Sequence, residues 1–239
     1  MEQSDELQRT FWNKWNSENR QHDVGEISRR QSQVIEEWLV ELGRRDLNIL
    51  EVGCGNGWFC PTLAKFGNVT GTDISDEVLS ASRTRWPQIK FVAGDFAKLD
   101  FAPMSFDVLV SLEVLSHVAD QNKFFTRLSE LLKPGGHLFL ATQNRPVLQN
   151  YCRVPTQQPG QLRKWVDRTE LASLASKHFE IESLFSITPI AHKHFRRLLT
   201  SNKVNRLTAP LLGHGLRDFM EKRDWGWTLM LKAKKRDGH

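Results

Sequence analysis

Short apolar segments alternate with helical patterns from Ile49 onward, and this alternation limits the fold more than any other feature. The apolar segments are mostly unbroken and rich in β-branched or aromatic residues, as are strands buried on both faces of a parallel sheet. They lie at residues 48–52, 68–74, 89–94, 106–112, 137–142, 179–187 and 226–233. Strands and helices in this order predict an α/β protein with a doubly wound, Rossmann-like sheet and helices on both faces.

The helical stretches between these segments carry recognisable end signals. Ser75 precedes a stretch with acids in its first turn, as an N-cap residue does. A second helix is expected to start at Asp120 and to stop at residues 134–136, where Pro-Gly-Gly follows. Residues 168–179 form a third helical stretch, and residues 34–42 give one apolar helix face before the first strand.

The composition fits a folded, soluble protein, because 39% of the 239 residues are hydrophobic and 26% are charged. No apolar run approaches the roughly 20 residues that a membrane helix needs, so no membrane insertion is expected. The polar, acidic N-terminus has no signal-peptide core, and three cysteines do not make a disulfide framework. We therefore expect a cytoplasmic protein.

Charge is distributed unevenly along the chain. Residues 1–119 hold 12 Lys/Arg and 18 Asp/Glu, a balance of −6, whereas residues 120–239 hold 21 and 10, a balance of +11. The basic half suits an anionic substrate or surface. It is equally compatible with a basic face that is merely solvated.

Three segments, residues 1–25, 144–165 and 190–224, are too long for ordinary connections, and long connections in compact domains are often functional. We expect a single domain over residues 1–239 with a cofactor-binding core at 49–143. The N-terminal arm (1–30) and the insertions at 144–165 and 190–224 are expected to form an irregular, partly helical cap over the site.

Gly53, Gly55 and Gly57 follow the first strand and open a helix, so they lie where open α/β sheets bind ligands. Three glycines so close together suggest that something lies against the main chain. Asp73 stands 20 residues after Gly53, at the end of the second strand, where an acid can accept both hydroxyls of a ribose. These positions predict a cofactor that contains a nucleoside.

The G-x-G-x-G spacing differs from the dinucleotide fingerprint G-x-G-x-x-G, and no lysine-serine/threonine pair of a P-loop is present. Glu51 at the head of the loop would repel a pyrophosphate but suits a ligand with a sulfonium and an ammonium. Asp95, at the end of the third strand, is placed to accept a hydrogen bond from an adenine amine.

With these residues the chain resembles the class I S-adenosylmethionine-dependent methyltransferases. The segments "EVGCGNG", "GTDIS", "AGDF", "FDVLVSLEVLSHV" and "LKPGGHLFLAT" occur in that family's order and spacing over residues 49–142. The fourth-strand segment is most similar to the branch that includes the ubiquinone-biosynthesis O-methyltransferases. The resemblance implies a seven-stranded sheet whose last strand is antiparallel, S-adenosyl-L-methionine as cofactor and S-adenosyl-L-homocysteine as product.

The resemblance also implies which residues bind the cofactor. The glycine loop would hold the methionyl part, Asp73 the ribose, and Asp95 with Phe96 the adenine. Arg29 would pair with the cofactor carboxylate, or would simply be an exposed arginine at a helix start. The complete expected cofactor set is Arg29, Glu51, Gly53, Cys54, Gly55, Gly57, Asp73, Ile74, Asp95, Phe96 and Leu112.

Methyl transfer needs a base only when the acceptor arrives protonated, as a hydroxyl does. His117 is the best candidate because histidine titrates near neutral pH, although it could instead cap or pack at a helix start. Glu113, beside Leu112, would lie under the transferring methyl group. We expect no metal, because Cys60, Cys152 and the His192-x-His194 pair lack metal-ligand spacing.

The acceptor is expected to be a small molecule, and an anionic one would suit the basic cap. Trp12 contributes to an aromatic cluster that either forms a wall of the site or anchors the arm. Arg196 and Arg197 either bind a phosphate or carboxylate or form a solvated basic face. Phe195, Leu198 and Leu199 could form an inward-facing lid. The complete expected acceptor set is Trp12, Arg145, Tyr151, Arg196 and Arg197.

Two other functions remain open. An RNA-modifying methyltransferase is suggested by the sequence pI of about 9.2. It is not favoured, because "SLEVL" occupies the place of the N-P-P-[YF] element and no Pro-Cys pair is found there. A non-catalytic S-adenosylmethionine-binding interaction protein is the third possibility.

Overall fold

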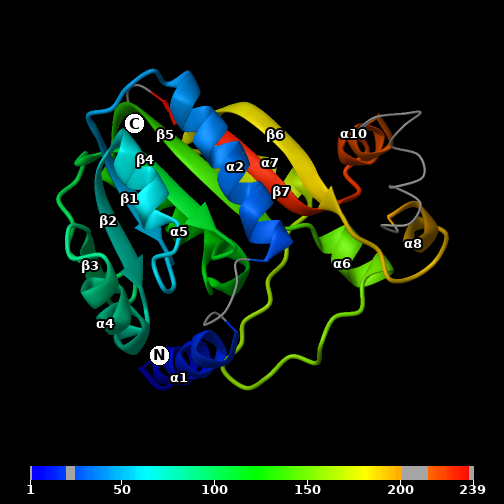
Figure 1. The fold of residues 1–239 in the computed structure, drawn as a ribbon, viewed down its shortest axis with the longest axis horizontal. Helices are drawn as coiled ribbons and strands as arrows, with labels where there is room; N and C mark the ends of the chain where they lie inside the picture. The colour runs from blue at the N-terminus through cyan, green and yellow to red at the C-terminus, as the bar shows by residue number, and fades with distance from the viewer. Residues whose placement is uncertain (1, 20–24, 201–214, 237–239) are drawn as a thin grey trace.

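The computed structural model describes residues 2–19, 25–200 and 215–236, whose strands form one seven-stranded sheet (Figure 1). The strands are β1 (Leu47–Val52), β2 (Gly67–Asp73), β3 (Lys90–Ala93), β4 (Phe106–Leu112), β5 (Leu132–Gln143), β6 (Phe179–Pro189) and β7 (Gly226–Lys235). All seven strands predicted from the sequence are present, with ends that shift by a few residues.

The strand order is β3-β2-β1-β4-β5-β7-β6. Strands β1 to β5 pair in parallel, while β7 lies antiparallel between β5 and β6. The expectation that the last strand is antiparallel is therefore confirmed. The chain moves outward from β1 to β3 and then returns to the other side of β1, so strand order reverses between β1 and β4. Ligands of open α/β sheets bind beyond the carboxyl ends of the strands at such a point.

Helices cover both faces of the sheet. The described helices are α1 (Glu2–Asn19), α2 (Glu26–Glu41), α3 (Cys60–Leu63), α4 (Asp76–Arg85), α5 (Gln121–Leu131), α6 (Arg145–Tyr151), α7 (Arg168–Ser176), α8 (Arg196–Leu199) and α10 (Gly215–Lys222), with the 3-10 turns η1 (Ala64–Phe66) and η2 (Leu115–His117). In Figure 1, α2 crosses one face, while α5 and α7 lie behind the sheet. Two buried apolar clusters, one on each face, match these two helical layers.

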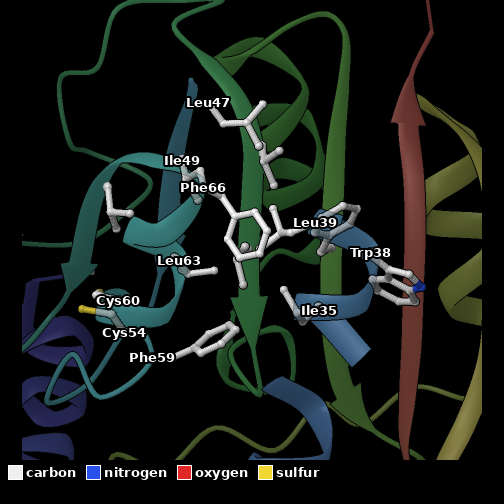
Figure 2. Packing of buried hydrophobic residues seen from close by; sticks show 14 of the residues in the cluster. Ile35, Trp38, Leu39, Leu47, Ile49, Cys54, Phe59, Cys60, Leu63 and Phe66 are labelled. Carbon is white, nitrogen blue, oxygen red and sulfur yellow. The ribbon is translucent and has the colours of Figure 1, made fainter. Parts of the chain in front are cut away.

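Helix α2 shows why the layers pack. Its apolar face, Ile35, Trp38 and Leu39 among others, is buried against residues from α3 and from β1 and β4 (Figure 2). The spacing of these side chains places them on one side of a helix with 3.6 residues per turn. Burying each large apolar side chain contributes about 1.5–3 kcal/mol, so this face fixes α2 on the sheet.

Helix ends follow the sequence signals in two cases. Ser75 Oγ accepts a hydrogen bond from the Val78 amide at 3.2 Å, and Asp120 Oδ1 accepts from the Lys123 amide at 3.0 Å. Both residues therefore act as N-caps.

The predicted end of α5 at residues 134–136 was wrong. The helix ends at Leu131, and Pro134–Gly136 lie inside β5, where the pairing register jumps from Leu132 to His137. A residue that precedes proline disfavours the helical conformation, so the helix stops earlier and the Pro-Gly-Gly stretch forms a bulge in the strand.

The segments expected to form a cap contain helices α1, α6, α8 and α10, and residues 20–24 and 201–214 of these segments lie outside the described residues. The lid expected from Phe195, Leu198 and Leu199 is not formed as predicted. Phe195 and Leu198 are 59% and 68% exposed, because α8 is a single turn with no buried residue.

Within the described ranges, no helix is long and apolar enough to span a bilayer. The three cysteines, Cys54, Cys60 and Cys152, are buried free thiols.

Candidate functional site

A cavity of about 660 Å³ lies at the carboxyl edge of β1, β2 and β4. In Figure 1 these strands point toward α1 and toward the connection that follows α6. The cavity wall includes many of the predicted site residues: Trp12, Gly53, Gly55, Asp73, Ile74, Asp95, Phe96, Leu112, Glu113 and His117. Its volume is within the usual range for small-molecule sites.

The remaining predicted residues do not line this cavity: Arg29, Glu51, Cys54, Gly57, Arg145, Tyr151, Arg196 and Arg197. Some of them lie beneath the glycine loop, and the others belong to ion pairs, ring contacts or exposed surface elsewhere.

The glycine loop has a left-handed backbone at Gly53 (φ 72°), Gly55 (φ 56°) and Gly57 (φ 66°). A Cβ atom at Gly53 would lie 2.2 Å from Val114 Cγ2, and one at Gly57 would lie 2.8 Å from the Phe91 ring. Both the dihedral angles and the close neighbours exclude other side chains. Packing within the protein thus requires Gly53 and Gly57 independently of any ligand.

Asp73 connects the loop to the helix that follows β2. Its Oδ2 accepts a hydrogen bond from the Gly55 amide at 2.9 Å, and its Oδ1 accepts from the Ser75 amide at 3.0 Å. Asp73 also lines the cavity, and a carboxylate oxygen can accept more than one hydrogen bond.

Asp95 and Phe96 lie at the β3 side of the cavity. Asp95 Oδ1 accepts from the Ala97 amide at 3.0 Å, and Oδ2 lies 3.5 Å from Lys98 Nζ. The Phe96 ring packs edge-on against Phe124, with 5.4 Å between centroids. This end of the cavity therefore offers an acceptor next to an apolar surface.

Glu51 and two thiols lie under the loop, out of the cavity wall. Glu51 is 2% exposed, and its Oε2 accepts a hydrogen bond from Cys60 Sγ at 3.0 Å. Figure 2 shows Cys54 beside Cys60. The hydrogen bond with Cys54, burial and the charge of Glu51 raise the pKa of the Cys60 thiol. The thiol stays protonated at neutral pH, so it is not an activated nucleophile.

Glu113 has a left-handed backbone (φ 63°), which is unusual for a residue with a Cβ. Its amide donates to the Ala141 carbonyl at 2.8 Å. Its Oε1 accepts from Gln31 Nε2 at 2.5 Å and from Thr228 Oγ1 at 3.4 Å. Gln31 and Thr228 are both buried, so α2 and β7 together hold this carboxylate at the cavity wall.

His117 lies at the end of η2, and its Nδ1 is 2.7 Å from the Leu162 carbonyl oxygen. A carbonyl only accepts, so Nδ1 carries the proton and Nε2 keeps its lone pair. Burial is the main cause that lowers the pKa of His117 to about 4. The charge of Arg163 also lowers this pKa, whereas the hydrogen bond with Leu162 raises it. The Trp12 ring packs edge-on against the imidazole at 4.6 Å between centroids.

The connection over residues 152–165 contacts η2, α5 and α1. The Lys164 amide donates to the Ser116 carbonyl at 2.7 Å, and Gln121 Nε2 donates to the Lys164 carbonyl at 2.8 Å. A Cβ atom at Gly160 would lie 2.4 Å from the Leu7 carbonyl oxygen, so this glycine permits close contact with α1. These contacts hold the connection over the cavity.

The cap arginines that were expected to bind the acceptor do not line the cavity. Arg145 pairs with Asp167 at 2.5 Å and with Glu170 at 2.8 Å, which fastens α6 to α7. The position of Arg145 beside Glu170 of α7 and its N-cap residue Asp167 could not be seen in the sequence pattern.

Arg196, the first residue of α8, stacks on Tyr151, the last residue of α6. The Arg196 guanidinium lies 3.7 Å from the Tyr151 ring centroid and 3.9 Å from that of Trp225. Arg197 is exposed. In this arrangement the three residues lie away from the cavity wall, because α8 packs toward Trp225 instead.

Arg29 is also exposed and outside the wall, whereas its neighbours Ile27 and Ser28 line the cavity. Residues 27, 28 and 31 share one side of α2, and a rotation of about 100° per residue turns Arg29 away from it.

Several wall residues were not assigned from the sequence, above all Gln143, Arg163, Trp165 and Trp227. Trp227 is the second residue of β7, whose antiparallel direction brings its first residues to the carboxyl edge of the parallel strands. That direction was expected, so it could have identified Trp227. Arg163 gave no comparable signal.

Comparisons with known proteins agree with this architecture. Residues 50–140 match the family described as "Methyltransferase domain". The ubiquinone biosynthesis O-methyltransferase of Sinorhizobium medicae is 36% identical over 110 residues, which cover 41% of this chain and 42% of the relative. The match thus spans less than half the length of that curated relative.

Solved structures extend the similarity to nearly the whole chain. The N-methyltransferase NodS of Bradyrhizobium japonicum, in complex with S-adenosyl-L-homocysteine, has a TM-score of 0.65 at 15% identity and covers 96% of this chain and 98% of its own. The 1,6-didemethyltoxoflavin-N1-methyltransferase of Burkholderia thailandensis has a TM-score of 0.64 at 18% identity, with 97% and 88% covered. Residues 50–140 thus match a methyltransferase domain, and the chain as a whole shares the fold of these methyltransferases.

Proposed function

We propose that this protein transfers a methyl group from S-adenosylmethionine to a hydroxyl of a small molecule. The observation that carries the proposal is the tautomer of His117, which the Leu162 carbonyl holds with the proton on Nδ1 and a lone pair on Nε2. His117 lies in the wall of the same cavity as Asp73 and Asp95.

The residues around the loop fit the proposed cofactor. Gly53 and Gly55 expose backbone to the cavity, and Asp73 and Asp95 offer acceptors to hydroxyl and amine groups. Lys98 Nζ lies 3.5 Å from the Asp95 carboxylate. Lys98 is not part of a phosphate-binding lysine-serine/threonine motif. This donor set suits a nucleoside without phosphates. Gly53, Gly55, Asp73, Asp95 and Phe96 would therefore hold it.

The bound cofactor supplies a methyl group already activated by the sulfonium. The protein then has to align the acceptor, exclude water and remove a proton from a hydroxyl. Glu113, held by Gln31 and Thr228, would orient the acceptor, and His117 Nε2 would take the proton. The aromatic side chains Trp12 and Trp227 would exclude water.

Two lines of support distinguish O-methylation from N-methylation. The curated relative is named an O-methyltransferase, although the solved neighbours named above are N-methyltransferases. A protonated hydroxyl needs a base during transfer more than a neutral amine does, and the tautomer of His117 provides one.

The proposal can be tested by labelled methyl transfer. The purified protein is incubated with S-adenosylmethionine labelled in the methyl group and with a cell extract separated into small molecules and RNA. Mass spectrometry then identifies the labelled product and its methylated atom. We expect label on oxygen in the small-molecule fraction, and we expect its rate of incorporation to fall by about a hundredfold or more with His117→Asn.

Label confined to RNA would support the alternative of an RNA-modifying enzyme. Cofactor binding without any transfer would support a non-catalytic binding protein. Label on nitrogen would refute O-methylation while leaving the methyltransferase assignment intact.

A further inference from the structure

One cation in the cavity wall differs from the others. Four basic side chains line the cavity, and three lie near a carboxylate: Lys98 by Asp95 (3.5 Å), Lys123 by Asp120 (3.7 Å) and Arg127 by Glu130 (3.2 Å). The fourth, Arg163, has no ion pair with any residue that the structure describes.

Arg163 is held in a defined position by its own segment. Its Nη1 donates to the Pro155 carbonyl at 2.5 Å, and its guanidinium lies 5.7 Å from the Trp165 ring centroid. Its two neighbours are fixed to the His117 turn: Leu162 accepts from His117 Nδ1, and the Lys164 amide donates to Ser116. The guanidinium is thus placed beside the proposed base rather than extended into solvent.

The surroundings of Arg163 leave most of its charge uncompensated. Partial burial lowers the pKa of Arg163, and among the described residues no acidic group opposes that shift. Burial and the charge of Arg163 both lower the pKa of His117. A guanidinium has five N–H donors, and the contact with Pro155 uses one of them. A partly buried cation of this kind is stabilised when an anion binds to it.

The wall around it is mainly apolar and aromatic. Indole rings of Trp12, Trp15, Trp165 and Trp227 line the cavity, with Leu148 and Val154. Flat apolar surfaces favour a planar ring, because they bury its faces. A planar fork of donors at one point of such a wall matches the geometry of a carboxylate.

We propose that Arg163 binds a carboxylate on the methyl acceptor, and that the acceptor is a planar aromatic acid. This inference rests on the proposed function, which locates the acceptor at the His117 end of the cavity. It replaces Arg145, Arg196 and Arg197 as anion-binding residues, because their guanidinium groups lie outside the wall.

The test compares ligands that differ only in charge. Calorimetry measures the affinity of 3-hydroxybenzoate against 3-hydroxybenzamide, and of 3-hydroxycinnamate against its amide, with and without S-adenosylhomocysteine. The two pairs place the charge at different distances from the ring. The proteins are the wild type, Arg163→Gln and Arg153→Gln. Arg153 is a matched control, because it is an exposed arginine of the same segment outside the cavity wall.

We expect the wild type and Arg153→Gln to bind at least one acid about tenfold or more tightly than its amide, as a charge-assisted pair should. Arg163→Gln should lose that preference while binding S-adenosylhomocysteine unchanged. A preference that survives in Arg163→Gln would overturn the inference. So would a wild type that binds neither member of either pair, or that binds acid and amide equally.

The cofactor measurement separates this inference from the proposed function. A wild type that fails to bind S-adenosylhomocysteine would contradict the methyltransferase assignment, whatever the acids do. Normal cofactor binding without any acid preference would contradict the role of Arg163 alone.

Discussion

The imidazole of His117 and the carbonyl of Leu162 are 2.7 Å apart, which fixes the proton on Nδ1. Leu162 lies 45 residues after His117, in the connection over residues 152–165. The connection therefore closes the cavity and also sets the tautomer of the side chain that we propose as the base. Opening it would change the exclusion of water and the chemistry of His117 together.

The first prediction concerns pH. Burial lowers the pKa of His117 to about 4, and only the neutral imidazole accepts a proton. Because the lowered pKa keeps it neutral down to about that pH, kcat should stay level from pH 8 to pH 5 and fall with a midpoint near 4. A pH profile of kcat at saturating cofactor checks this. A midpoint near 6.5 would show that the imidazole is not buried during turnover.

The second prediction separates a catalytic role of His117 from a packing role. In His117→Asn, the side-chain amide can still donate to the Leu162 carbonyl, but no nitrogen is left to accept a proton. We expect kcat at pH 7.5 to fall by about a hundredfold or more, with thermal stability and cofactor affinity close to wild type. His117→Ala should regain part of its activity at high pH, where the acceptor ionises. Equal losses for both variants at every pH would indicate packing.

The third prediction concerns the support of Glu113. Gln31→Ala removes the donor at 2.5 Å from Glu113 Oε1 and should lower the free energy of unfolding by about 1–3 kcal/mol. It should also reduce kcat by roughly tenfold, because a misplaced carboxylate misaligns the acceptor. Urea denaturation and steady-state kinetics measure these effects.

Gln33→Ala is the matched control, since Gln33 is an exposed glutamine on the same helix. If both variants change kcat alike, the effect comes from α2 as a whole rather than from the contact with Glu113.

The fourth prediction concerns Asp73. Asp73→Ala removes the acceptor for the Gly55 and Ser75 amides and the proposed ribose contact. Affinity for S-adenosylmethionine should fall by about a hundredfold, as expected for loss of charge-assisted hydrogen bonds. Asp76 is an exposed acid on α4, so Asp76→Ala should change the affinity for S-adenosylmethionine by less than about twofold. Unchanged affinity in Asp73→Ala, measured by calorimetry, would remove Asp73 from the cofactor site.

The fifth prediction tests why Gly53 is a glycine. Gly53→Ala should lower the free energy of unfolding by about 3 kcal/mol, because its Cβ meets Val114 Cγ2 and its φ is positive. Adding Val114→Ala should recover the part that comes from the clash. A double-mutant cycle measured by denaturation gives that coupling.

Cofactor affinity of the double variant answers a separate question. If the ligand also lies against Gly53, binding should remain weak after stability is recovered. Full recovery of binding would mean that only internal packing requires this glycine.

The sequence determined most of the sheet because strand burial leaves a local record. Unbroken apolar segments mark strands covered on both faces, and residues such as Ser75 and Asp120 mark helix starts through contacts with residues three positions away. The order of these signals also placed Gly53, Asp73, Asp95 and His117 near one edge, since the ends of parallel strands share it.

Only the tertiary structure decided which cations face the cavity. Arg145, Arg196 and Arg197 resembled anion-binding residues in the sequence, yet acids and rings from distant segments engage Arg145 and Arg196, and Arg197 is exposed. Arg163 carried no signal of its own. Whether a charge is paired depends on which side chains the folded chain brings within a few ångströms, and residue spacing does not encode that distance.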